Sequence, residues 1–189
     1  MPTWLIIILI VVGLLALIVL IWAISTSNYF KTAKVKIDES KSSIDVALTK
    51  RFDLLTKSLA SVKGYAKHEF ETLSKVIELR NSRGISDMNM KEKSDFNSKL
   101  DQAASGINVV MEQYPELKAN TNFNKLQDQI SDCEDNLQAA RRIFNSNVST
   151  YNQKVVSFPS SIIANMKHFE KEEFFVAEEA KKQDVNIEF

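Results

Sequence analysis

Residues 123–158 read FNKLQDQISDCEDNLQAARRIFNSNVSTYNQKVVSF. This stretch decides the fold, because its apolar residues recur at spacings of three or four over about ten helical turns. They are Phe123, Leu126, Ile130, Cys133, Leu137, Ala140, Phe144, Val148, Tyr151, Val155 and Phe158. Such a stripe follows one face of an α-helix, and a helix of this kind has to bury the stripe against other helices.

Two earlier stretches carry stripes of the same kind. The first begins at Ile37 and continues to about Arg80 through Ile44, Leu48, Leu55, Leu59, Val62, Ala66, Leu73 and Ile77. The second comprises Phe96, Leu100, Ala103, Ile107, Val110 and Tyr114. Each stripe predicts a long helix whose apolar face packs into a shared core.

The residues between the first two stripes favour the end of one helix and the start of the next. Asn81-Ser82-Arg83-Gly84 favours a helix end, and we expect Gly84 to adopt the left-handed conformation there. Asn89 with Glu92 three residues later is typical of a capping box.

Two prolines predict the remaining breaks. Pro115 disfavours helical geometry at the residue before it, and Pro159 follows the long third stripe. We expect Ser160 or Ser161 to cap a short last helix. The apolar residues of that helix are Ile162, Ile163, Met166 and Phe169.

No window of four to eight residues alternates convincingly enough for a strand, so the fold class is all-α. We predict an antiparallel four-helix bundle of three long helices and one short one, preceded by a transmembrane helix. The chain has four Gly, three Pro and one Cys. This composition argues against a loop-rich all-β fold and against a disulfide framework.

The N-terminal region is long and apolar enough to cross a membrane. Residues 4–24 read WLIIILIVVGLLALIVLIWAI and contain no charge. As a helix they extend about 31 Å, close to the hydrocarbon thickness of about 30 Å. A cleaved signal sequence is the alternative, but Met1-Pro2-Thr3 lacks a basic residue and the apolar run is too long.

The apolar run and the stripes together predict three regions. They are an anchor at residues 1–27, a bundle at 28–175 and a frayed charged tail at 176–189. Residues 25–30 contain no helix breaker, so the sequence leaves open whether the anchor and the first bundle helix are continuous.

Charge favours one orientation of the anchor and argues against one class of partner. The 24 basic and 24 acidic residues balance, which argues against nucleic-acid binding. The four lysines that follow the anchor favour an outside N-terminus and a cytoplasmic bundle. They are Lys31, Lys34, Lys36 and Lys41. A bundle on the outer side is the alternative.

Several motifs resemble those of the LemA family of bacterial membrane-anchored proteins. They are SIDVALTKRFDLL, VKGYAKHE, YPELKAN, RIFNSNVSTYNQKVVSFP and the pair Phe174-Phe175. The chain departs from the family at Ser40-Lys41-Ser42 and Thr56-Lys57, and the missing proline should make the first bundle helix more continuous. The resemblance implies a helical bundle at the bacterial inner membrane and no established enzymatic activity.

One pair of residues could suggest hydrolysis. His68-Glu69 begins like a zinc-protease motif, but Thr72 stands where the second histidine is needed. We therefore expect no metal and no cofactor. A hydrolase that uses His68 and Glu69 remains the alternative, because other helices can bring further ligands to such a site. Cys133 lies within an apolar stripe and is interpreted as a core residue.

Polar residues beside the stripes are the better candidates for function. They are Asp45, Arg51, Asp53, Glu134, Arg141, Asn145 and Asn152. They either fix the register of the helices through hydrogen bonds and ion pairs or form a surface that binds a partner. Phe174 and Phe175 either dock on the bundle or anchor a partner.

These features favour a scaffold or adaptor without catalysis. Its contacts would be membrane lipid through residues 4–24 and other membrane proteins or copies of itself. The alternative is a subunit or regulator of a membrane enzyme.

Overall fold

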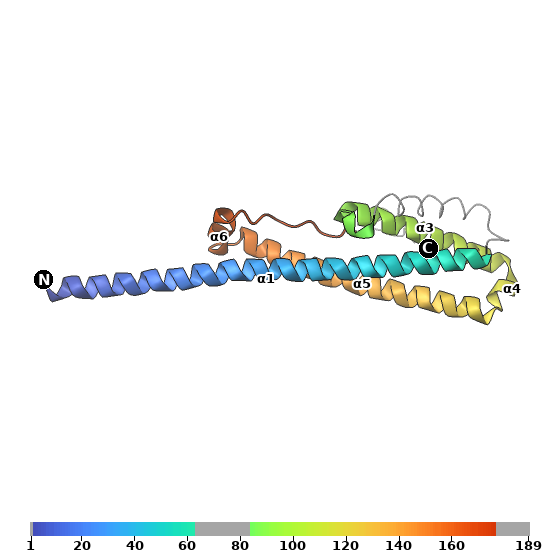
Figure 1. The fold of residues 1–189 in the computed structure, drawn as a ribbon, viewed down its shortest axis with the longest axis horizontal. Coiled ribbons are helices and arrows are strands. Elements are labelled where there is room, and N and C mark those ends of the chain that lie inside the picture. Colours follow the sequence, from blue (N-terminus) through green and yellow to red (C-terminus); the bar gives the residue numbers. More distant parts are fainter. Residues whose placement is uncertain (1, 63–83, 177–189) are drawn as a thin grey trace, which may run out of the picture. The chain divides into compact units, whose positions relative to one another are not determined.

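The computed structural model describes residues 2–62 and 84–176, and within these ranges every regular element is helical. The elements are α1 (Thr3–Val62), the single 3-10 turn η1 (Ile85–Asp87), α3 (Met90–Gln113), α4 (Pro115–Lys118), α5 (Thr121–Val156) and α6 (Ser160–Met166) (Figure 1). The prediction of an all-α fold is confirmed.

The helix α1 extends without interruption over 60 residues (Figure 1). The predicted membrane segment and the first predicted bundle helix are therefore parts of one element. The expected helix end near Arg80, the stripe residues beyond Val62 and the turn at residues 81–83 lie outside the described residues.

The chain forms two compact units. Unit 1 comprises residues 1–38 and 146–172, and unit 2 comprises residues 39–145 and 173–189. Both α1 and α5 contribute to each unit.

The core of unit 2 consists of apolar side chains from α1, α3 and α5. Ile44, Leu48, Phe96 and Leu100 are completely shielded from solvent. The rings of Phe52 and Phe96 stack with their centroids 6.2 Å apart, which joins α1 to α3. Further buried stripe residues are Leu55, Leu59, Val62, Ala103, Ile107, Val110, Phe123, Ile130, Cys133, Leu137, Ala140 and Phe144. The stripes thus identified the core-facing residues of these helices.

The predicted start and end of α3 are confirmed. The Asn89 side chain accepts a hydrogen bond from the Glu92 amide, and the Glu92 carboxylate accepts one from the Asn89 amide. The helix ends at Gln113, and Tyr114 caps it. Pro115 then begins the short helix α4, which the stripe did not predict. The expected left-handed Gly84 is wrong, because this residue has φ −61° and ψ 147° and precedes η1 in extended geometry.

An aromatic cluster forms the core of unit 1. Phe30 is completely buried and contacts Tyr151 edge-on, with centroids 5.9 Å apart. The ring of Phe169 stacks on Phe30 with centroids 4.8 Å apart. Phe169 was expected inside the last helix, but α6 ends at Met166 and the ring reaches Phe30 from the segment that follows.

Two expectations at the turn between α5 and α6 are wrong. Ser160 does not cap α6, since its hydroxyl donates hydrogen bonds to the carbonyls of Lys154 and Ser157 at the end of α5. The Ser160 hydroxyl thus gives the Lys154 carbonyl a partner where α5 ends, whereas the Ser157 carbonyl also accepts from the Ser161 amide. Phe158 continues the stripe by spacing but is 83% exposed, because α5 already ends at Val156.

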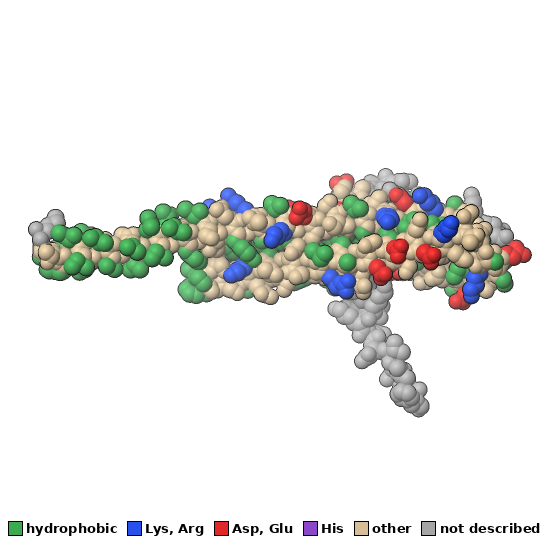
Figure 2. All heavy atoms as spheres, turned by 90° about the horizontal axis from the view of Figure 1, so that it is seen from below, with side chains coloured by type: hydrophobic (Ala, Val, Ile, Leu, Met, Phe, Trp, Pro, Cys, Tyr) green, Lys and Arg blue, Asp and Glu red, His purple; other side chains and the backbone are tan. Residues whose placement is uncertain are grey.

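The N-terminal part of α1 is exposed on all sides. Figure 2 shows hydrophobic side chains covering it. Among the described residues, α1 is the one helix long and apolar enough to cross a membrane, and none of its most apolar window is buried.

Candidate functional site

Arg51 of α1 joins three helices of unit 2. Its side chain is almost fully buried, and Nη1 donates to Asn97 Oδ1 of α3 over 2.7 Å. Nη2 lies 2.6 Å from Glu134 Oε1 of α5 and 2.7 Å from Asp101 Oδ1 of α3. Glu134 was a candidate from the sequence, whereas Asn97 and Asp101 were missed.

The two acidic partners offset the cost of burying the guanidinium charge. The Asp101 side chain is 25% exposed and that of Glu134 is 46% exposed, so both carboxylates keep part of their hydration. Arg51 Nε is left without a hydrogen-bond partner within the described residues. A polar cavity of about 270 Å³ adjoins this cluster, and Gln138 and Arg141 of α5 complete its wall.

A second ionic contact joins α1 to α3. Lys93 Nζ donates to Asp45 Oδ1, and the Lys93 side chain has no solvent exposure. Burial lowers the pKa of Lys93, and the hydrogen bond that Lys93 donates to Asp45 opposes this shift. Lys93 was missed, although it extends the Phe96 stripe by three residues toward the N-terminus and thus lies on the core face.

Arg141 and Asn145 hold the segment that follows α6. The Arg141 guanidinium lies 4.5 Å from the centroid of the Phe175 ring, in cation–π geometry. Burial lowers the pKa of Arg141. The Asn145 side chain donates to the Phe175 carbonyl over 3.0 Å and accepts from the Phe175 amide over 2.9 Å. Phe175 is 2% exposed, whereas Phe174 is 43% exposed.

Asn152 makes the corresponding contact within unit 1. Its side-chain amide donates to the Glu172 carbonyl and accepts from the Glu172 amide, each over 2.9 Å. The Glu172 carboxylate lies 3.1 Å from Lys34 Nζ of α1. This hydrogen bond raises the pKa of Lys34. Both asparagines therefore bind backbone groups of the segment after α6 in place of another helix.

The remaining candidates are not part of these clusters. Asp53 is exposed on α1 and takes no part in the Arg51 contacts described above. Cys133 Sγ lies 3.5 Å from the Ala47 carbonyl in the core, and burial raises the pKa of its thiol. His68 and Glu69 lie outside the described residues. Among the described residues, no group of three His, Cys, Asp or Glu side chains is arranged to hold a metal ion.

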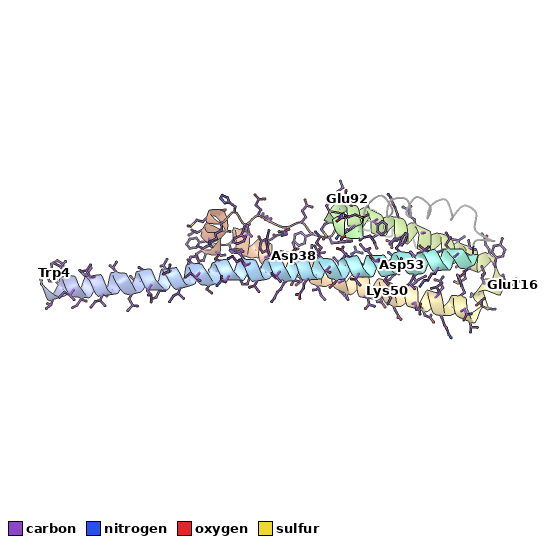
Figure 3. The ribbon with its side chains drawn as sticks, viewed as in Figure 1. Trp4, Asp38, Lys50, Asp53, Glu92 and Glu116 are labelled. Atoms are coloured by element: carbon purple, nitrogen blue, oxygen red, sulfur yellow. The ribbon has the colours of Figure 1, made fainter. Side chains whose placement is uncertain are left out.

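An open groove of about 900 Å³ follows one side of α1 in unit 2. Val46 lies in it with 66% of its surface exposed. Figure 3 labels Lys50 and Asp53, which also line it. Ile85 of η1 and Gln129 of α5 contribute to its walls. The mixed polar and apolar lining suits a protein segment better than a small charged ligand.

Comparison with known proteins places the chain in a family. The model of the LemA family matches residues 40–189. Protein LemA of Metamycoplasma hominis is 29% identical over 151 residues, which cover 80% of this chain and 69% of that protein. The matched region contains Arg51, Glu134, Asn145 and Asn152.

Proposed function

Because the chain belongs to the LemA family, we propose that it is a membrane-anchored helical protein that acts by binding other proteins, without catalysis. The observation that carries this proposal is the course of α1. One helix begins with an exposed apolar segment and continues into the packed core of unit 2. Such a helix attaches the folded body directly to its anchor.

The exposed segment supports anchoring in lipid. Its side chains at Leu9, Ile10, Val12 and Leu15 are each more than half exposed, and water would solvate such a surface unfavourably. A helix satisfies its own backbone hydrogen bonds and can therefore enter hydrocarbon. Trp4 and Trp22 lie near the two ends of the run, where interfacial tryptophans are common.

The polar candidates support binding in preference to catalysis. Arg51 and Lys93 pair with acidic side chains of neighbouring helices, and Asn145 binds the backbone at Phe175. These contacts stabilise one arrangement of the body. A scaffold needs such a defined surface more than it needs a reactive side chain.

We place the partner in the groove along α1. The exposed Val46 offers an apolar contact there, and Lys50 and Asp53 offer charges of both signs. Other membrane proteins or a second copy of the chain fit this chemistry. The orientation that we propose has the N-terminus outside and the body in the cytoplasm, since the lysines that follow the anchor favour it.

Site-specific photo-crosslinking in native membranes tests the partner surface. A crosslinking amino acid at Val46 should give adducts of defined mass, whereas one at Val109, which is 50% exposed on α3 outside the groove lining, should not. Adducts at both positions alike, or recovery of the monomer alone from both, would count against the groove as a binding surface.

Orientation needs a separate measurement. Cys133 is buried and unsuited to labelling, so a new cysteine at the exposed Asn136 serves as reporter in a Cys133→Ala background. A membrane-impermeant maleimide should label it only after the cells are permeabilised. Labelling in intact cells would place the body on the outer side.

A further inference from the structure

Four exposed apolar side chains surround the turn between α5 and α6 in unit 1. We call them the α6 surface: Val156 (56% exposed), Phe158 (83%), Ile162 (48%) and Met166 (71%). Ile162 and Met166 are four residues apart and share one side of α6. The opposite side of the same helix is buried through Ile163 and Ala164. α6 is thus apolar on both sides, and its outer side has no partner within the described residues.

This surface lies beside the end of the membrane segment. A cavity of about 350 Å³ is lined by Trp22 and Thr26 of α1 together with Phe158 and Pro159. Phe169, three residues after the end of α6, stacks on Phe30 of α1. The chain after α6 therefore contacts α1 several residues beyond Trp22 and Thr26. Figure 2 shows further hydrophobic side chains where the apolar part of α1 meets the folded part of this unit.

The position along α1 corresponds to the headgroup layer of a bilayer. The apolar run ends at Ile24, and the six residues from there to Phe30 rise about 9 Å. The polar layer on each side of the hydrocarbon is about 5–7 Å thick. A helix that packs beside residues 22–30 therefore lies at the depth of the lipid headgroups.

The chain from the end of α5 through α6 carries lysines that would attract anionic lipid, and acidic residues begin only at Glu170. Residues 146–169 contain Lys154 and Lys167 and no acidic residue. Lys154 Nζ lies 5.8 Å from the centroid of the Tyr29 ring, next to the cavity described above. Apolar side chains flanked by lysines are typical of helices that lie in a membrane interface.

We propose that the α6 surface inserts into the headgroup layer and forms a second contact with the membrane. The inference rests on the proposed anchoring of α1, since it places the bilayer around residues 4–24. Continuity with the apolar run and the lysines that flank the surface both favour lipid over a protein partner as the occupant.

Depth-dependent fluorescence quenching tests this contact. Single cysteines replace Phe158 and Met166 in the full-length Cys133→Ala chain and carry an environment-sensitive fluorophore. The chain is reconstituted into vesicles of phosphatidylcholine and phosphatidylglycerol. Spin-labelled lipids quench the fluorophore from either the headgroup or the end of the acyl chain. Cysteines at Val12, within the apolar run, and at Val109, on α3 of unit 2, are the references.

The α6 surface should be quenched more strongly by the shallow label than by the deep one, and Val12 should show the reverse. Val109 should respond to neither. If Val12 responds while Phe158 and Met166 behave like Val109, the α6 contact is wrong and the anchor stands. An unquenched Val12 would overturn the anchor itself and the inference with it. The fluorophore at position 158 could instead shift its emission to the blue as the protein concentration rises, with no quenching by either lipid label. That result would identify a second copy of the chain as the occupant and overturn the lipid contact.

Discussion

Arg51 is the residue at which α1, α3 and α5 meet in unit 2. A buried guanidinium is tolerated when hydrogen bonds and opposite charges replace its lost hydration. Asn97, Asp101 and Glu134 provide those replacements. Because each partner comes from a neighbouring helix, the cluster favours one register of the three helices over others.

Replacing Arg51 by Met should destabilise the protein by about 2–4 kcal/mol, because Asn97 and Asp101 would lose their contacts with the guanidinium in a largely buried site. Urea unfolding followed by circular dichroism measures the change. Arg142→Met is the matched control, since this neighbour of Arg141 is exposed, and its effect should stay within about 0.5 kcal/mol. Equal effects of the two substitutions would contradict a stabilising role of the Arg51 cluster.

Lys93 predicts a specific pH dependence of stability. Burial lowers its pKa in the folded protein below the usual value near 10.5. At a pH between the lowered pKa of the folded protein and the usual pKa of the unfolded chain, the unfolded chain binds the proton and the folded chain releases it. The free energy of unfolding therefore rises with pH in this range. Below the lowered pKa both states hold the proton, and the full cost of burying the charge opposes folding.

The difference in unfolding free energy between wild type and Lys93→Met isolates this effect, because the other titrating groups largely cancel. It should increase in favour of wild type as the pH rises through the range just below the usual lysine pKa of about 10.5. A difference that is constant or falls over this range would show that burial does not lower the pKa of Lys93.

The sequence identified some of these residues and missed others for a physical reason. Arg51 and Glu134 were selected because charged residues stood beside apolar stripes. Lys93 occupies a stripe position itself, where lysine is seldom fully buried. The signal was present in its spacing to Phe96, but only a structure shows that Asp45 lies within reach.

At the scale of elements, the apolar periodicity of the sequence predicted where the helices lie. It predicted the residues at which they begin and end less well. The capping box at Asn89 was recognised because both of its partners lie within four residues. The conformation of Gly84 and the role of Ser160 depend on neighbouring elements. Ser160 meets the last carbonyls of α5, which compete for its hydroxyl with the first amides of α6.

The segment after α6 was expected either to dock on the bundle or to anchor a partner. The sequence did not predict which residues of α5 it contacts. An asparagine side chain carries both a donor and an acceptor, so it can pair with the amide and the carbonyl of one residue. Asn145 pairs in this way with Phe175 in unit 2. Asn152 does so with Glu172 in unit 1.

Asn145→Ala should release Phe175 from α5 with little effect on the helices of unit 2. Loss of two hydrogen bonds costs about 1–2 kcal/mol locally, which corresponds to roughly tenfold faster hydrogen exchange at the Phe175 amide. Asn145→Asp keeps the acceptor for that amide and should retain more protection. Asn136→Ala, at an exposed position of α5, is the control. Unchanged exchange at Phe175 in Asn145→Ala would contradict the contact.

At the scale of the whole molecule, composition alone is misleading. The balanced charge and moderate apolar content describe an ordinary soluble protein, yet the first charged residue is Lys31. The chain therefore has an uncharged apolar end and a highly charged body. The all-α class and the continuity of α1 agree with that division, and family membership extends over residues 40–189.

Function could not be predicted to the same depth, because a binding surface has no fixed spacing of residue types in the sequence. The groove beside Val46 combines α1, η1 and α5, and the α6 surface depends on where α5 ends. Phe158 was placed in the core by its spacing, and its exposure is what indicates the second membrane contact.

Alkaline carbonate extraction of membranes from expressing cells tests the anchor, the central feature of the molecule, most directly. The comparison is with the double variant Leu14→Arg and Leu15→Arg, which places two charges near the middle of the apolar run. Each charge raises the free energy of membrane insertion by about 2.5–3.5 kcal/mol. The wild-type chain should remain in the membrane pellet at its full mass of 21.5 kDa, and the double variant should appear in the supernatant. Release of the wild-type chain by carbonate, or a membrane-free product shortened by the apolar run, would contradict anchoring by α1.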